Sequence, residues 1–261
     1  MSIHPTAIIA EGAVIPASCT VGPFCTIGTN VVLGEDCELV SHVVLDGHTT
    51  FGKGNKVYSF TCIGISPQDL KYAGEPTRVQ IGDNNSIREY VTISRGTTGG
   101  GGLTKIGSDN LIMAYVHIGH DSVIGSGCIL PNGATLAGHV TVEDFATLSA
   151  NAPVHQFCTI GRYAYIGGGT TITQDVLPYS LTSIERNNHA YGINKVGLAR
   201  KGFTPEELRE LATAMRLLTS GKRNTTQALA EINDMLASGD AGDHVRYLAD
   251  FVAKSERGVI K

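Results

Sequence analysis

Aliphatic side chains recur every six residues along most of this chain. The series starts at Ile3, Ile9 and Ile15, and it runs unbroken from Ile106 to Ile172. A period of six fits neither the helical repeat of about 3.6 residues nor the alternation of a single strand. It suits a short strand followed by a turn, with three such units closing a coil of about 18 residues. The pattern predicts a mainly β protein, a parallel β-helix whose stacked coils lie about 4.8 Å apart.

Small or β-branched side chains occupy a second set of positions, four residues after each aliphatic residue. No Cys-x-x-Cys pair is present, and five of the six cysteines fall at these positions. They are Cys19, Cys25, Cys37, Cys128 and Cys158. We therefore expect small core residues rather than metal ligands or reactive thiols.

Two segments interrupt the repeat. Residues 65–78 are polar and contain two prolines, and residues 96–104 contain a Gly-rich run. No Gly-Lys-Ser or Gly-Lys-Thr motif follows the glycines, as a phosphate-binding loop would require. We predict two external loops, the second of them flexible. Such loops on a rigid support are frequent places for function.

Helical patterns replace the repeat after Val176. The stretch Thr204–Glu207 combines a helix cap, a first-turn proline and a capping-box glutamate. The expected helices run from Thr204 to near Gly221, from Thr226 to about Ala237 and from Asp243 to Lys254. We therefore divide the chain into a β-helix domain, residues 1–188, and a C-terminal helical bundle, residues 189–261.

Composition narrows the range of partners. The net charge is −4 and charged residues make up 17%, so the basic excess of a nucleic-acid-binding protein is missing. No apolar stretch approaches the roughly 18 residues of a membrane span. The N-terminal residues also lack the pattern of a signal peptide. We expect a cytoplasmic protein that neither binds nucleic acid nor inserts into a membrane.

Polar residues with the spacing of one coil gather around residue 120. Residues 18 apart should lie above one another, which places Gly138 and Gln156 above His120, and His139 above Asp121. The predicted strip crosses three coils, and His117 precedes it at the end of a strand. Its members are His120, Asp121, Gly138, His139, His155 and Gln156.

The residues alone leave three interpretations of this strip open. Single histidines on a solenoid surface are usually ordinary surface residues, although four of the nine histidines fall in this region. Stacked imidazoles could bind zinc, as in a hexapeptide-repeat carbonic anhydrase family. That family separates two histidines by four residues, whereas two residues separate His117 from His120. An imidazole beside a carboxylate could also act as a general base.

Four segments resemble the UDP-N-acetylglucosamine O-acyltransferase family: His117–Asp121, Leu136–Val140, Val154–Cys158 and Gln68–Arg78. The similarity covers essentially the whole chain. It implies a left-handed coil and a homotrimer with active sites between subunits. It also implies transfer of an (R)-3-hydroxyacyl chain from acyl carrier protein to the 3-hydroxyl of UDP-N-acetylglucosamine, the first step of lipid A biosynthesis. Neither a cofactor nor a metal is expected.

The resemblance also implies residue roles. His120 would take the proton from the attacking hydroxyl, Asp121 would orient or stabilise the imidazolium, and the Gly138 N–H would hold the oxyanion. Gly168 matches a position of the acyl-chain pocket. The expected substrate contacts are Gln68, Asp69, Lys71, His117, His139, His155, Gln156, Asn194, Arg200 and Lys201.

Two positions depart from the family pattern. Val196 stands where a glutamate is expected and Lys201 where an arginine is expected, which affects the nucleotide contacts. A 3-amino sugar remains an alternative acceptor. A related N-acyltransferase carries an additional N-terminal domain, and repeats that begin at Ile3 argue against it. Docking of the acidic carrier protein is expected at basic residues. These are Arg200, Lys201, Arg209, Arg216, Lys222 and Arg223.

Overall fold

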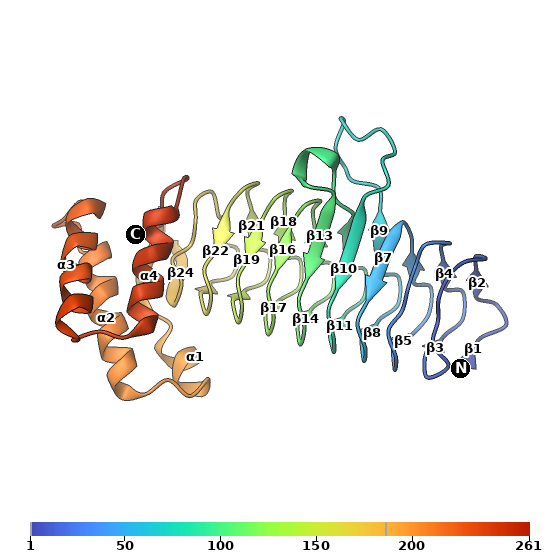
Figure 1. Ribbon diagram of the computed structural model, residues 1–261, viewed down its shortest axis with the longest axis horizontal. Coiled ribbons are helices and arrows are strands. Elements are labelled where there is room, and N and C mark those ends of the chain that lie inside the picture. Colours follow the sequence, from blue (N-terminus) through green and yellow to red (C-terminus); the bar gives the residue numbers. More distant parts are fainter. Residues whose placement is uncertain (1, 186) are drawn as a thin grey trace.

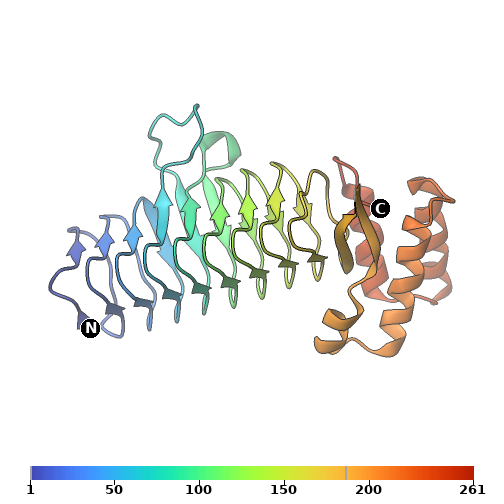
Figure 2. The same cartoon turned by 180° about the vertical axis from the view of Figure 1, so that it is seen from behind.

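The computed structural model describes residues 2–185 and 187–261. It shows a long three-sided coil with helices at its C-terminal end (Figures 1 and 2). The strands form three sheets, which we call faces A, B and C, and each strand pairs with the strand one coil further along.

Face A has eleven strands. They are β1 (Ser2–Ile3), β3 (Thr20–Val21), β5 (Glu38–Leu39), β8 (Lys56–Val57), β11 (Ser86–Ile87), β14 (Leu111–Ile112), β17 (Ile129–Leu130), β20 (Thr147–Leu148), β23 (Tyr165–Ile166), β24 (Ser180–Glu185) and β25 (Asn187–Ile193). Face B has eight: β2 (Ile8–Ile9), β4 (Thr26–Ile27), β6 (Val44–Leu45), β9 (Cys62–Ile65), β12 (Thr92–Ser94), β15 (His117–Ile118), β18 (Thr135–Leu136) and β21 (Pro153–Val154). Face C has six: β7 (His48–Phe51), β10 (Arg78–Ile81), β13 (Leu103–Ile106), β16 (Val123–Ile124), β19 (Thr141–Val142) and β22 (Thr159–Ile160).

Parallel pairing confirms the predicted coil length. Ser2 pairs with Thr20, and His117 pairs with Thr135, so one coil takes 18 residues. The partners on face C are further apart where the two insertions leave the coil, as in the pair Thr50 and Gln80. Both insertions project outward (Figure 1), and the ladder continues past them with a register shift between Ile93 and Ser94.

Aliphatic side chains of the six-residue series fill the interior. Ile27, Ile63 and Ile118 are at most 1% exposed. The five cysteines predicted to be core residues are buried, whereas Cys62, which is out of phase, is half-buried. Burial raises the pKa of the Cys128 thiol to about 12, so this thiol stays protonated and unreactive at neutral pH.

Asparagines replace the small core residue in three successive coils. Asn55, Asn85 and Asn110 are buried, and their side chains form a ladder along the axis. Asn85 donates from Nδ2 to Oδ1 of Asn55 at 2.9 Å and to the carbonyl of Gly107 at 3.0 Å. Its Oδ1 accepts the N–H of Asn110 at 3.0 Å. The ladder satisfies polar groups that the apolar interior would otherwise leave without partners.

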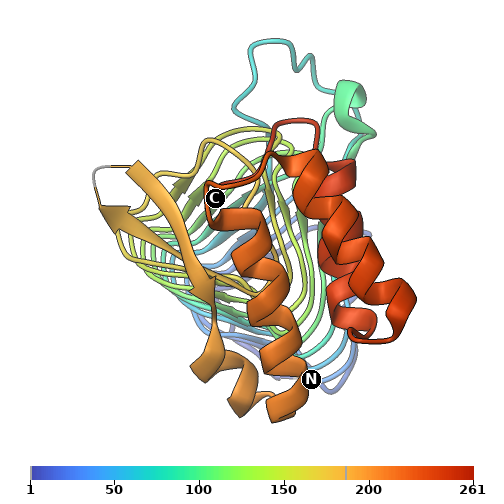
Figure 3. The same cartoon turned by 90° about the vertical axis from the view of Figure 1, so that its left-hand side faces the viewer.

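Among the described residues, four α-helices follow the coil: α1 (Lys195–Arg200), α2 (Pro205–Thr219), α3 (Thr225–Ser238) and α4 (Asp243–Lys254). The capping box predicted at Thr204 and Glu207 begins α2. Helices α2 to α4 enclose a second hydrophobic cluster and lie across the end of the coil (Figure 3). In the described residues, no helix is both long and apolar enough to cross a membrane.

Two elements of this region were not predicted: the antiparallel pair β24 and β25, and the short helix α1. The domain boundary predicted between residues 188 and 189 falls within the span of β25 and stays a prediction.

Replacing Asn85 with alanine should lower the free energy of unfolding by roughly 2–4 kcal/mol. The change leaves the buried Asn110 N–H and Gly107 carbonyl without their present partners. Chemical denaturation followed by circular dichroism measures the loss. The control Asn132→Ala removes an exposed side chain and should stay within about 0.5 kcal/mol. Equal stabilities of the two variants would contradict the role of the ladder.

Candidate active site

The residues of the predicted strip lie along the edge where faces B and C meet. His120 and Asp121 form the turn from β15 to β16, and Gly138 and His139 form the turn from β18 to β19. The two turns are adjacent, because the N–H of His139 donates to the carbonyl of His120 at 2.9 Å. The structure thus brings these four residues together on two successive coils.

His120 and Asp121 form a close pair. Nδ1 of His120 lies 2.8 Å from Oδ2 of Asp121, whose side chain is fully buried. A carboxylate can only accept hydrogen bonds, so the imidazole donates from Nδ1. Nε2 of the neutral ring is then free to accept a proton, which is the arrangement that a general base requires.

Gly138 lies directly against the His120 ring. A Cβ built at Gly138 would be 2.6 Å from both Nε2 and Cε1 of His120, so a side chain here would displace the ring. In the described part of the chain, the Gly138 N–H has no hydrogen-bond acceptor. A free backbone donor beside Nε2 of His120 is suited to a developing oxyanion.

Thr97 and Thr104 hold Asp121 in place, and sequence analysis missed both. The Thr97 N–H donates to Oδ1 of Asp121 at 2.8 Å, and its hydroxyl donates to Oδ2 at 2.6 Å. The Asp121 N–H donates to the Thr104 hydroxyl at 2.9 Å. The Gly-rich segment is external, as predicted, and its Thr97 folds back onto Asp121, whereas its flexibility stays a prediction. No fixed spacing in the sequence connects Thr97 with Asp121, since an insertion separates them.

His139 stacks on Phe157 one coil further along. Their ring centroids are 4.5 Å apart with an angle of 13° between the planes. The His139 ring also meets the edge of His120, with centroids 5.1 Å apart. Sequence analysis missed Phe157, although it lies 18 residues after His139 and the coil spacing points to it. An exposed aromatic ring beside the pair offers a flat apolar surface to a substrate.

The remaining histidines of the region lie differently. His117 is half-buried, and its Nδ1 is 2.8 Å from the Thr92 hydroxyl. Burial lowers the pKa of His117, and the nearby His120 lowers it further. His155 is exposed and donates from Nδ1 to the carbonyl of Gln156 at 3.0 Å. Both His155 and Gln156 extend the strip into solvent.

The loop that carries Gln68, Asp69 and Lys71 leaves the same edge, between β9 and β10. It stands beside the Gly-rich segment (Figures 1 and 2). Oδ1 of Asp69 accepts the Lys71 N–H at 3.0 Å, while the Gln68 and Lys71 side chains are exposed. Arg95 anchors the loop by donating from Nε to the Tyr72 hydroxyl at 2.9 Å.

The expected nucleotide contacts lie elsewhere on the chain. Oδ1 of Asn194 accepts the Gly197 N–H at 3.2 Å and caps α1, at whose C-terminal end Arg200 is exposed. Nζ of Lys201 is 4.8 Å from the ring centroid of Phe145, in the turn from β19 to β20. This turn belongs to the edge between faces C and A. One chain therefore does not bring Asn194, Arg200 and Lys201 to His120.

The position where the family pattern has glutamate is also on this helix. Val196 is 64% exposed in the first turn of α1. A carboxylate at this position would face solvent or a neighbouring molecule rather than the core. Val196 therefore removes a polar contact without creating one inside the chain.

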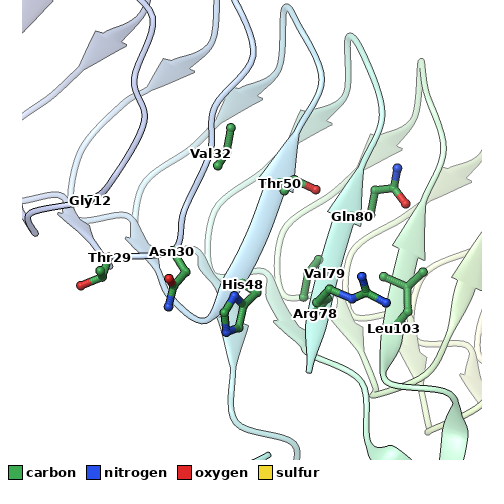
Figure 4. A pocket seen from close by; sticks show the side chains of 10 residues that line it. All are labelled: Gly12, Thr29, Asn30, Val32, His48, Thr50, Arg78, Val79, Gln80 and Leu103. Atoms are coloured by element: carbon green, nitrogen blue, oxygen red, sulfur yellow. The ribbon is translucent and has the colours of Figure 1, made fainter. Parts of the chain in front are cut away.

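A groove of about 670 Å³ lies on the outer surface of face C, over β7, β10 and β13. Side chains of His48, Arg78 and Gln80 line it (Figure 4). His120 is not among its lining residues. The histidine strip therefore lies outside this groove, on an edge of the coil that is open in a single chain.

The strip also has the ligand atoms of a metal site. Candidate ligand atoms of His120, Asp121 and His139 lie within 4.8 Å of one another. The Asp121 carboxylate, however, already accepts two hydrogen bonds from Thr97 and one from His120. A metal ion bound between the carboxylate and the imidazole would replace the His120–Asp121 hydrogen bond.

Comparisons with known proteins give one consistent result. The family model described as "Udp N-acetylglucosamine O-acyltransferase; Domain 2" matches residues 175–260, and the bacterial transferase hexapeptide model matches residues 103–138. The solved UDP-N-acetylglucosamine acyltransferase of Francisella novicida is 41% identical, with 99% of this chain and 93% of that chain covered and a TM-score of 0.94. LpxA from Acinetobacter baumannii is 39% identical, with 99% of each chain covered and a TM-score of 0.95. The chain belongs to the UDP-N-acetylglucosamine O-acyltransferase family.

Membership extends over the full architecture. The Arabidopsis UDP-N-acetylglucosamine acyltransferase is 33% identical, with 99% of this chain and 100% of that chain covered and a TM-score of 0.83. The predicted left-handed parallel β-helix of hexapeptide repeats with a C-terminal helical bundle is confirmed. As a member of this family the protein is an acyltransferase. An acyltransferase acting on a hydroxyl needs a base, so the family favours the general-base interpretation of the strip over zinc.

Because burial lowers the pKa of His117, a smaller fraction of its ring should be protonated at pH 6.5 than in an unperturbed histidine, which is half protonated there. The unfolded state then binds more protons below this pH, so folding stability should fall as the pH drops through 6.5. NMR titration of labelled histidines measures the midpoint directly, with the denatured chain as control. The variant His117→Gln should lose less stability on acidification. A midpoint at or above that of the denatured chain would refute this assignment.

Proposed function

We propose that this protein transfers an (R)-3-hydroxyacyl chain from acyl carrier protein to the 3-hydroxyl of UDP-N-acetylglucosamine, the first step of lipid A biosynthesis. One observation carries the proposal. The His120 ring, held by the buried Asp121 carboxylate, lies against Gly138 on the next coil, and the Gly138 backbone N–H has no acceptor in the described residues. The sugar nucleotide and the acyl transfer in this proposal are inferred from the names of the solved relatives.

The proposed reaction needs these three groups. Nε2 of His120 takes the proton of the sugar hydroxyl while its oxygen attacks the thioester carbonyl. The Gly138 N–H donates to the oxyanion of the tetrahedral intermediate. The C–S bond then breaks, and the imidazolium returns the proton to the sulfur of the carrier. Asp121 stabilises the imidazolium during the two steps. The products are the sugar ester and the free carrier thiol, so neither a redox step nor a covalent enzyme intermediate is involved.

Further residues complete the substrate site in this proposal. Gly168, in the turn that follows β23 of face A, lies on a different edge from His120. The acyl chain would pass Gly168, where an added Cβ would have its nearest neighbour, the Ala150 carbonyl oxygen, at 3.7 Å. A larger side chain at this position would leave room only for a shorter acyl chain. The proposed contacts on the strip and its loop are Gln68, Asp69, Lys71, His117, His139, His155 and Gln156.

We also propose that the site is shared between subunits of a homotrimer. Asn194, Arg200 and Lys201 lie on a different edge from His120, so they can reach the same substrate only from a neighbouring chain. Leu70 supports this proposal, because its side chain is fully exposed on the loop beside the strip. A large apolar side chain at such a position favours contact with another subunit.

The acidic carrier protein would dock on basic residues of the helical domain. Arg209 and Arg223 form ion pairs with Glu206 and Glu231 at 2.5 Å. Arg216 and Lys222 are exposed on the same domain. These two are therefore the better candidates, together with Arg200 and Lys201, to attract an acidic partner.

Replacing His120 with alanine should lower kcat by about 10²–10⁴-fold, because the attacking hydroxyl then loses its base. The assay combines the purified protein with carrier-bound acyl chains of several lengths, and with sugar nucleotides that bear a 3-hydroxyl or a 3-amino group. His48→Ala, a histidine on face C outside the strip, should remain within about twofold of wild type. A fully active His120→Ala variant would remove the mechanism. A wild-type protein that acylates neither sugar nucleotide would remove the function.

Mixed trimers test whether the site is shared. The chain His120→Ala has an intact nucleotide edge, and the chain Arg200→Glu/Lys201→Glu has an intact His120 edge. Each alone should be nearly inactive, and co-refolding the two in equal amounts should restore roughly a quarter of wild-type activity, one complete interface in four. Sedimentation should give three times the chain mass of 27.5 kDa. No recovery on mixing would assign both edges to one chain.

A further inference from the structure

The Asp121 carboxylate packs against the segment 96–102, which leaves the β-helix one coil before Asp121. Thr97 is 7% exposed and donates twice, from its N–H to Oδ1 and from its hydroxyl to Oδ2. The same Oδ2 accepts the hydrogen bond from His120. The carboxylate thus has a fixed orientation between a threonine of the loop and the imidazole of the edge.

Glycines let the loop approach Asp121 this closely. A Cβ at Gly100 would lie 2.1 Å from Cγ of Asp121, and a Cβ at Gly96 would lie 2.8 Å from Oδ1. In contrast, a Cβ at Gly99 would meet nothing within 4 Å. The Gly-rich composition is therefore required at particular positions, where backbone packs against the carboxylate, and not along the whole run.

The coil itself fixes the backbone of Thr97. Its carbonyl accepts the Gly102 N–H at 2.7 Å, which closes the loop at its base. The Gly96 N–H donates to the Arg78 carbonyl at 3.2 Å, and the Arg78 N–H donates to the Gly102 carbonyl at 2.9 Å. Arg78 is the first residue of β10, so the ladder of face C determines where the Thr97 donors point.

We propose that Thr97 is a positioning residue of the acyl transfer, which orients the Asp121 carboxylate so that His120 presents Nε2 to the substrate. This inference rests on the proposed function of His120. A buried carboxylate needs hydrogen-bond donors to remain charged. Without the Thr97 hydroxyl, Oδ1 would keep the bond from the Thr97 N–H, and Oδ2 would keep the bond from His120 and the longer 3.8 Å contact with Nε2 of His139. The carboxylate would lose the hydroxyl bond that fixes Oδ2, so the orientation of the imidazole would be less tightly set. Thr97 acts through Asp121 and does not touch the substrate.

The decisive variants are Thr97→Val and Thr97→Ser. Valine keeps the branched shape but removes the hydroxyl, so kcat should fall about tenfold, as expected for losing one hydrogen bond to a charged group. KM for the sugar nucleotide should stay within about twofold. Serine retains the hydroxyl and should restore most of the rate. Equal rates for Thr97→Val and wild type, or a serine variant as slow as the valine variant, would overturn the proposal.

Two glycine variants provide a second test that leaves Thr97 unchanged. Gly100→Ala places a methyl group against the Asp121 carboxylate and should lower kcat at least as much as Thr97→Val. The matched control Gly99→Ala adds the same methyl group one residue earlier, in open space, and should behave as wild type. Thermal unfolding of all variants checks that each is folded. A Gly100→Ala variant with wild-type kcat would count against the role of the segment.

A double-mutant cycle separates a positioning role from a general structural one. If Thr97 acts through Asp121, Thr97→Val should lower kcat by less than about twofold in the background Asp121→Asn. A full tenfold loss in that background would show that Thr97 acts by another route. An inactive wild-type protein would instead refute the proposed function. A normal wild type with an unaffected Thr97→Val variant would refute this inference alone.

Discussion

Hydrogen bonds between successive coils place the side chains along the edges of this protein. The N–H of His117 donates to the carbonyl of Ala134 at 3.1 Å, and the N–H of His139 donates to that of His120 at 2.9 Å. Such bonds lock each coil above the last, so that residues 18 apart share an edge. This stacking brings the turn of His120 next to the turn of Gly138. A slip of one residue would turn the aliphatic series outward and separate the pair.

Polar groups inside the coil also form hydrogen bonds from one coil to the next. Asn55, Asn85 and Asn110 stand in phase with core cysteines, and each donates to a carbonyl of the next coil, so these buried amides have hydrogen-bond partners. Asp121 is different, because it is a buried acid at the edge and needs donors that the regular coil does not provide. The insertion that brings Thr97 supplies them. The interruption of the repeat is thus part of the site.

The flat faces of the coil do not enclose His120 within a cleft of one chain. The edges of the coil offer turns, and the walls of a substrate site come from loops such as the one that carries Lys71, or from another chain. The separation of His120 from Lys201 on two edges follows from this geometry. The groove on face C, lined by His48 and Arg78, does not include His120 among its lining residues.

The sequence by itself determined the repeating coil and the helix that begins with a capping box. The six-residue period specified the coil, the core phase of Ile118 and the level of His120 with Gly138, and the capping box at Thr204 located a helix. Phe157 was within reach of the same spacing. Only the tertiary structure decided the contact of Thr97 with Asp121 and the use of Asn194 as a helix cap. A regular repeat fixes which residues stack, because each coil has the same length. An insertion changes the spacing, so the contacts of the inserted residues depend on how the loop folds back in space.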